Sequence, residues 1–181
     1  MLNLRTRALA EIGQSPDAVR EELTVAASSV PCQYLLPRTV AAFVRQFPAM
    51  SISLRQRNSH TACDDIFQYR CQLGVAGEKH LPDKLAYLIL LKDELVIAVP
   101  YSEEFKPLLT KEKLTVAELS AYRLLLREPG SATRSLLERA MAKTGLVLQS
   151  YRHTVFDSQE TIKQAVRQGL GVSVLSRRTD A

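Results

Sequence analysis

The stretch Glu22–Pro37, ELTVAASSVPCQYLLP, decides the fold, because in it an apolar strand leads directly into a hydroxyl-bearing turn. Residues 23–27 have the length and composition of a short buried strand. Ser28 and Ser29 follow, at the point where a parallel α/β sheet ends a strand and begins a helix. The first unit predicted is therefore strand, polar turn and helix.

The helix expected after this turn carries a single apolar stripe. Its members recur at i, i+3, i+4 and i+7, namely Val40, Phe43, Val44 and Phe47. Pro48 is expected to end it. Pro37 leaves two alternatives, a separate first turn over 31–36 or a kinked helix, because an interior proline loses a hydrogen bond and clashes with the preceding turn.

Strand and helix patterns alternate along the rest of the chain. Strands are expected over residues 50–55, 72–76, 85–90, 94–99, 124–126, 152–156 and 171–175. Helices are expected over about 59–68, from Thr115, from Ser131 to Gly145 and from Asp157 to Gly169. This alternation predicts an α/β fold with a largely parallel sheet.

Length and composition exclude several classes of protein. The chain has 181 residues, of which 46% are apolar and 24% charged, enough for one medium domain or two small lobes with a real core. The longest apolar run, Leu85–Leu91, is far shorter than the ~18–20 residues that cross a membrane. The N-terminus has no signal-peptide core, so we expect a cytoplasmic protein. The net charge of +5 is scattered and gives little indication of nucleic-acid binding.

The reactive residues form no recognisable catalytic or metal-binding pattern. Cys32, Cys63 and Cys71 are an odd number without a CxxC pair, which indicates reduced and mostly buried thiols. The three histidines lack HxxxH or HExxH spacing, and no GxSxG, Walker or GxGxxG motif occurs. We therefore expect no catalytic residue, no metal and no cofactor, and a function that is not enzymatic.

Chemistry is expected instead where strands end in polar turns. Four turns share hydroxyl or amide side chains and a helix start: Ser28-Ser29-Val30, Asn58-Ser59, Gly130-Ser131-Ala132-Thr133 and Asp157-Ser158-Gln159. The carboxyl ends of parallel strands share one edge of a sheet, where ligands bind. Helix N-termini there offer N–H groups and partial positive charge to a small anion. The alternative for each serine is ordinary helix capping.

Three runs of sequence resemble the effector-binding domain of LysR-type transcriptional regulators, in the order and spacing of that family. They are Glu22–Pro37, Leu126–Arg134 and Thr161–Val172. The resemblance spans about residues 22–178. It implies an α/β fold of the two-lobed, periplasmic-binding-protein-like (type 2) kind, with largely parallel sheets. The implied division is lobe I over 22–98 and 157–181, lobe II over 99–156, and a remnant of a linker helix and connector over 1–21.

The resemblance also implies that a small anionic effector binds between the lobes. The residues expected at this site are Ser28, Ser29, Val30, Asn58, Ser59, Gly77, Arg127, Ser131, Thr133 and Ser158. Val30 stands where many members have threonine or serine, so only its backbone could contribute. Two alternatives stand for Arg127, which could supply a cation to the effector or pair with Glu128.

Partners follow from the same resemblance. It implies a homodimer, tetrameric in the full-length protein, with DNA bound only through a helix-turn-helix domain absent from this chain. Family members also carry a further strand and helix beyond the last strand expected here. The alternative function is a solute-binding protein of a transport system with the same two-lobed fold, which the missing signal peptide and short chain disfavour.

Overall fold

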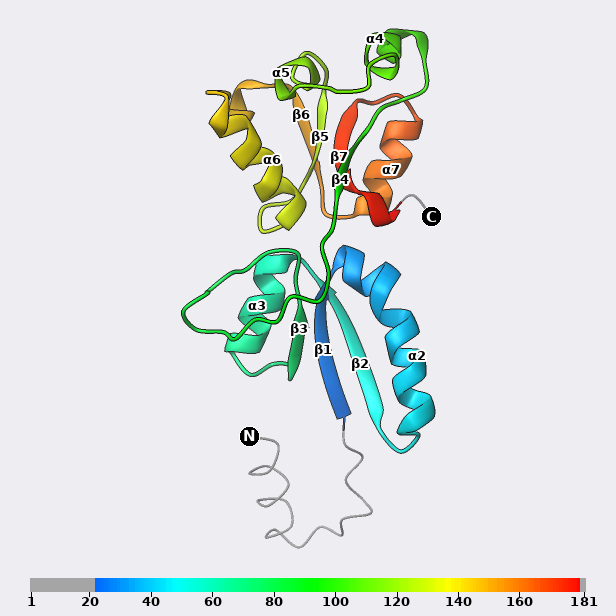
Figure 1. Cartoon of the computed structure of the whole chain (residues 1–181), viewed down its shortest axis with the longest axis vertical. Coiled ribbons are helices and arrows are strands. Elements are labelled where there is room, and N and C mark those ends of the chain that lie inside the picture. The colour runs from blue at the N-terminus through cyan, green and yellow to red at the C-terminus, as the bar shows by residue number, and fades with distance from the viewer. Residues whose placement is uncertain (1–21, 180–181) are drawn as a thin grey trace, which may run out of the picture.

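Three parallel strands form the first sheet of the computed structural model, which describes residues 22–179. Their order is β2-β1-β3, with bounds β1 (Glu22–Ser28), β2 (Ser51–Arg57) and β3 (Leu73–Val75). The central strand β1 is buried from Thr24 onward, as expected for a strand covered on both faces. The crossover helices α2 (Leu36–Gln46) and α3 (Ser59–Phe67) lie on opposite faces of this sheet (Figure 1). This sheet and its helices form lobe I.

The segment after β1 decides between the two alternatives for Pro37. A π-helical turn, Pro31–Leu35, continues directly into α2. The Leu36 N–H donates to the Pro31 carbonyl five residues earlier. Pro37 therefore lies in the first turn of α2, where its missing N–H costs least. The first turn, over residues 31–35, therefore differs from α2 in its π-helical hydrogen bonding, as the first alternative expects, but it joins α2 without a break.

Four strands form the second sheet, which lies end to end with the first (Figure 1). Its order is β4-β7-β5-β6, with bounds β4 (Leu95–Ala98), β5 (Leu124–Arg127), β6 (His153–Phe156) and β7 (Val172–Ser176). Only β4 is antiparallel to its neighbour. The helices of this lobe II are α4 (Lys106–Leu109), α5 (Val116–Leu119), α6 (Ala132–Lys143) and α7 (Gln159–Arg167).

The hydrophobic core is divided unequally between the lobes. The larger cluster lies in lobe II and gathers Phe105, Leu108, Leu119, Leu124, Leu126, Leu137, Met141, Leu148 and Val172. A second cluster beneath α7 holds Leu125, Ile162, Val166 and Leu175. In lobe I the buried cluster is small, consisting of Ala26, Ala62 and Cys71. Lobe II therefore contributes most of the apolar burial.

Strand pairing corrects the division of the chain expected from the sequence. β7 pairs with both β4 and β5, so residues 157–179 belong to the sheet of lobe II and not to that of lobe I. β4 lies in the same sheet. The described chain therefore passes between the sheets only once, between β3 and β4. The segment 1–21, expected to be a linker remnant, lies outside the described residues, as do residues 180–181.

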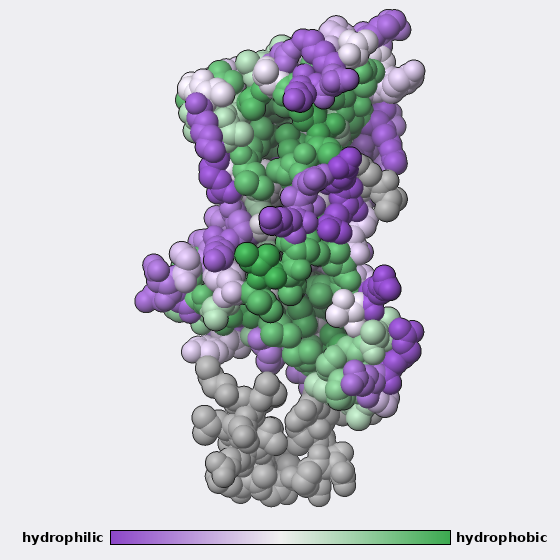
Figure 2. All heavy atoms as spheres, viewed as in Figure 1, coloured by the Kyte–Doolittle hydropathy of each residue, from purple (hydrophilic) through white to green (hydrophobic). Residues whose placement is uncertain are grey.

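The strand expected over residues 85–90 is absent from the structure. This segment has no regular hydrogen-bonding partner among the described strands, because β3 ends the first sheet on that side. Leu88, Ile89 and Leu90 are exposed, at 85%, 77% and 65% of their surface. Their apolar side chains gave the pattern of a buried strand, but burial needs a neighbouring strand. Figure 2 shows apolar side chains gathered over lobe I on this face.

None of the helices in residues 22–179 is both long and apolar enough to cross a membrane.

Candidate functional site

A cavity of about 790 Å³ extends from the apolar face of lobe I to the junction with lobe II. Its apolar part is lined by residues such as Leu23, Phe43, Ile52, Leu85 and Ile89. The cavity is also lined by every predicted site residue except Ser158: Ser28, Ser29, Val30, Asn58, Ser59, Gly77, Arg127, Ser131 and Thr133. Three of the four predicted turns therefore contribute predicted site residues to one cavity, and Gln159 of the fourth turn lines it as well.

Arg127 is the buried charge at the junction of the lobes. It is the last residue of β5 and only 5% exposed. Its Nη2 donates to the Ser29 hydroxyl of lobe I at 3.0 Å and to the Asp157 carbonyl at 3.4 Å. The Glu128 carboxylate accepts from Nε at 2.8 Å and from Nη2 at 3.0 Å. The pairing with Glu128 is thus present, and Arg127 also links the lobes.

One edge of the Arg127 guanidinium remains available. Within residues 22–179 its Nη1 donates to no protein group, while Nε and Nη2 are both engaged. A guanidinium carries five N–H donors, so the two on Nη1 can still bind an anion. Ser28 ends β1 and is buried beside Ser29, and Val30 precedes the π-helical turn without a side-chain cap. Val30 can offer only its backbone, as the sequence indicates.

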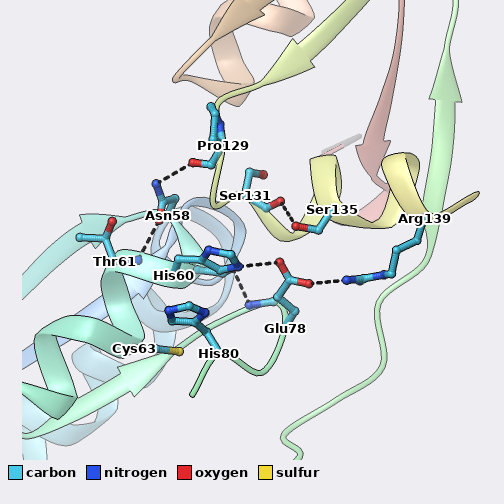
Figure 3. Close-up of polar contacts among 12 residues, drawn as sticks. Asn58, His60, Thr61, Cys63, Glu78, His80, Pro129, Ser131, Ser135 and Arg139 are labelled. Carbon is cyan, nitrogen blue, oxygen red and sulfur yellow. Dashed lines mark hydrogen bonds and ion pairs between the residues drawn. The ribbon is translucent and has the colours of Figure 1, made fainter. Parts of the chain in front are cut away.

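The start of α3 is occupied by protein groups. The Asn58 Oδ1 accepts from the Thr61 N–H at 2.9 Å, and its Nδ2 donates to the Pro129 carbonyl of lobe II at 3.3 Å (Figure 3). The His60 N–H donates to the Gly130 carbonyl at 3.2 Å. At this turn the capping alternative applies to Asn58, and the N–H groups of His60 and Thr61 are already bonded to protein groups.

Ser59 and Gly77 interact with each other at a close approach of the lobes. The Ser59 hydroxyl accepts from the Gly77 N–H at 3.0 Å. A Cβ at Gly77 would lie 2.8 Å from the Cβ of Ala132, at the start of α6. Glycine is therefore required for the observed contact between the lobes.

The start of α6 remains open to a ligand. Ser131 is its N-cap residue, 4% exposed, and makes no side-chain cap hydrogen bond. Its hydroxyl has no partner within the described part of the chain, although its carbonyl accepts from Ser135 (Figure 3). Thr133 follows in the first turn and lines the same cavity. A helix of 12 residues thus presents free N–H groups and a free hydroxyl there.

At the start of α7 the residue facing the cavity is Gln159 and not Ser158. The Ser158 hydroxyl accepts from the Thr161 N–H at 3.3 Å, so it caps the helix, and it does not line the cavity. Gln159 is 2% exposed and does line it. The sequence marks this turn as polar but cannot tell which of two adjacent side chains points inward.

A further contact between the lobes was not anticipated from the sequence. Glu78, after β3, lies 3.0 Å from the Arg139 guanidinium of α6 and 3.3 Å from His60 Nε2 (Figure 3). The His60 ring stacks on that of His80 with centroids 4.1 Å apart. Residues so distant in sequence carry no local motif, so no sequence signal could have identified this cluster.

The thiols have no feature of reactive cysteines. Cys63 and Cys71 are buried, Cys32 is partly buried, and all three are free. Burial raises the pKa of Cys32 and Cys71, which keeps both protonated at neutral pH. The Tyr87 hydroxyl oxygen accepts from the His80 N–H at 3.2 Å, and its single proton faces both Cys63 Sγ, at 3.3 Å, and the His80 carbonyl. Burial and the Cys63 contact raise the pKa of Tyr87 to about 12.

Comparison with known proteins matches this architecture to one family. The model of the LysR substrate binding domain matches residues 16–181. The chain belongs to this family. It is 33% identical over 147 residues to the HTH-type transcriptional regulator CbbR of Rhodospirillum rubrum, covering 81% of this chain and 47% of that protein. This LysR-family chain spans about half the length of the curated relatives it matches.

Solved structures agree with the family assignment. The regulatory domain of Synechocystis PCC6803 CcmR, in complex with 2-PG, superimposes with a TM-score of 0.73 at 25% identity, covering 88% of this chain and 74% of that one. The effector binding domain of QuiR, in complex with shikimate, gives 0.75 at 15% identity, with coverage of 88% and 75%. The two-lobed, periplasmic-binding-protein-like fold is thereby confirmed. An effector-binding domain fits these findings better than a solute-binding protein of transport.

Proposed function

We propose that this chain is the ligand-sensing part of a LysR-type transcriptional regulator, and that a small organic anion binds between its lobes. The observation that carries the proposal is that Ser29 from lobe I and Arg127 and Ser131 from lobe II line one and the same cavity. A ligand that touches both lobes stabilises one arrangement of the two. That is the differential contact a ligand needs in order to shift a conformational equilibrium.

The anionic character of the ligand is supported by three donors. The Arg127 Nη1 edge bonds to no protein group within residues 22–179, and the start of α6 presents free N–H groups. Ser131, a residue that is 4% exposed, makes no side-chain cap bond. Charge-assisted hydrogen bonds of this kind contribute about 1.5–3 kcal/mol each. The solved structure of the CcmR regulatory domain holds 2-PG, so a small ligand bound to a domain of this fold has a precedent.

A thermal-shift screen of small carboxylates, phosphates and sulfates tests the proposal. A ligand present at about 100 times its Kd stabilises the fold by ~2.7 kcal/mol, which for a chain of this length raises Tm by about 5–10 °C. Ser29→Ala and Ser131→Ala should each remove most of that rise. Thr115→Ala is the matched control, because it removes a hydroxyl cap from α5 outside the cavity. A full response in both cavity variants would reject the assignment of the site.

We further propose that the sensing domain is not an enzyme, works in the cytoplasm and acts as a homodimer, within a tetramer in the full-length regulator. The curated relatives CbbR of Rhodospirillum rubrum and CysL of Bacillus subtilis are HTH-type transcriptional regulators, which supports DNA binding through a domain outside this chain. A two-fold isologous interface is the expected symmetry of such a dimer. Light scattering should give twice the mass of the chain, and a monomer at every accessible concentration would contradict the dimer.

The chain alone should not protect one DNA sequence at physiological salt.

A further inference from the structure

Gln159 is a buried polar side chain whose hydrogen bonds are not made by the described protein. It is the first residue of α7, is 2% exposed and lines the cavity. Neither its Nε2 nor its Oε1 has a hydrogen-bond partner within residues 22–179. Nearly all buried polar groups are bonded, and an amide left without partners destabilises the folded state. A second molecule that completes these bonds would remove that cost.

The surroundings of Gln159 indicate which chemical groups that second molecule carries. The turn before α7 is next to Arg127, because the Asp157 carbonyl accepts from its Nη2 at 3.4 Å. The same Nη2 contacts Ser29. One end of the cavity therefore brings three groups together: the Gln159 amide, the Arg127 guanidinium and the N-terminus of the nine-residue helix α7. An anion held by Arg127 and this helix start would place its neighbouring atoms against Gln159.

An anion alone cannot satisfy this side chain. A carboxylate or phosphate oxygen accepts from Nε2, but it offers nothing to the Oε1 oxygen, which needs a donor. The complementary group both donates and accepts, as a hydroxyl does. We propose that Gln159 is a specificity-determining residue that recognises a hydroxyl group beside the anionic group of the ligand. This inference rests on the proposed function, since it names the ligand class for the same cavity.

Matched pairs of probes that differ in hydroxyl groups test the inference. We would compare glycolate with acetate, lactate with propionate, and glycerol phosphate with propyl phosphate, by thermal shift and calorimetry. The hydroxylated member of a pair should bind the wild-type protein about tenfold or more tightly. In Gln159→Met the two members should bind equally. Gln164→Met is the matched control, an exposed glutamine on the same helix, and should keep the preference.

A second measurement needs no ligand. Methionine has nearly the shape of glutamine without its polar atoms, so Gln159→Met should raise the Tm of the unliganded protein by about 2–4 °C. A lower Tm would mean that the amide is already bonded, for example to a buried water, and would overturn the inference.

The two proposals fail in different ways. If an anion binds through Ser29 and Ser131 but the pairs bind equally to the wild-type protein, the proposed function stands and the role of Gln159 is rejected. If no carboxylate, phosphate or sulfate binds, the proposed function itself is rejected, and the ligand class named here with it.

Discussion

At the scale of single residues, Gly171 lies so close to the backbone of Arg123 that no side chain fits at its position. A Cβ at this position would lie 2.2 Å from the carbonyl oxygen of Arg123, which accepts from the Val172 N–H at 3.0 Å. The opposing atom is backbone, so no side-chain rotation relieves the clash. We expect Gly171→Ala to lower the free energy of unfolding by about 3 kcal/mol or more, measured by urea unfolding followed by circular dichroism.

Gly169 provides the control for that measurement. Its φ is +78°, but a Cβ there would meet nothing within 4 Å. Gly169→Ala should therefore cost only the left-handed backbone strain, about 1–2 kcal/mol. Equal losses in the two variants would show that the backbone at Arg123 moves aside, and would contradict the prediction.

Most of the residues predicted for the candidate site line one cavity, and the physical reason is local. Hydroxyl-rich turns after strands are readable because strand end and helix start are adjacent in the chain. The sequence does not show which hydrogen-bond donors remain without a protein partner. Asn58 bonds to Pro129, 71 residues away, and Arg127 to Ser29, 98 residues away. Contacts at such separations depend on how the lobes meet, and so Gln159 was missed.

At the scale of elements, α5 is held at its start by a complete capping box. The Thr115 hydroxyl accepts from the Glu118 N–H at 3.3 Å, and the Glu118 carboxylate accepts from the Thr115 N–H at 2.7 Å. Lys111 donates to the same carboxylate. The hydrogen bond from Lys111, followed by those from Thr115, lowers the pKa of Glu118 from 4.5 to about 2.

This shift predicts the pH range in which Glu118 contributes to stability. Because the folded-state pKa is depressed, the contribution is fully present above pH 4.5 and is lost as the pH falls towards 2. The Tm difference between wild type and Glu118→Gln should therefore be largest above pH 5 and should shrink across that interval. Thermal melts at a series of pH values measure it. A difference that grows on acidification would refute the assignment.

Elements that carry a local sequence motif were predicted close to their observed bounds. Elements that depend on a neighbouring strand or helix were not. The capping box at Thr115 and the strand at 124–126 agree with α5 and β5. The apolar segment 85–90 has a strand composition, yet within residues 22–179 it pairs with nothing. The stripe on α2 was also predicted, but Val44 and Phe47 remain 40% and 43% exposed. The composition of a segment indicates which side chains are apolar enough to be buried. Whether they are buried depends on a neighbouring strand or helix.

At the scale of the whole molecule, Gly77 sets how closely the lobes approach. An added methyl group would press on Ala132 at 2.8 Å, across the junction. We expect Gly77→Ala to separate the lobes there and to weaken the bond from the His60 N–H to the Gly130 carbonyl. Hydrogen exchange at His60 should become faster than in the wild type.

Gly74→Ala is the matched control within lobe I. Its Cβ would lie 2.9 Å from Ile66 Cγ1, a side chain of the same lobe that can move. This variant should leave exchange at His60 unchanged. If both variants, or neither, alter that exchange, Gly77 does not control the approach of the lobes.

The single passage of the chain between the two sheets has a consequence for biosynthesis. β3 ends at Val75 before β4 begins at Leu95, so within residues 22–179 the ribosome makes the three strands of the first sheet before any strand of the second. Domains fold as units, N-terminal first, while the chain is being made. Ser29 can therefore be in place well before Arg127 emerges. Because residues of both lobes line the proposed site, it can be completed only after both lobes have been translated.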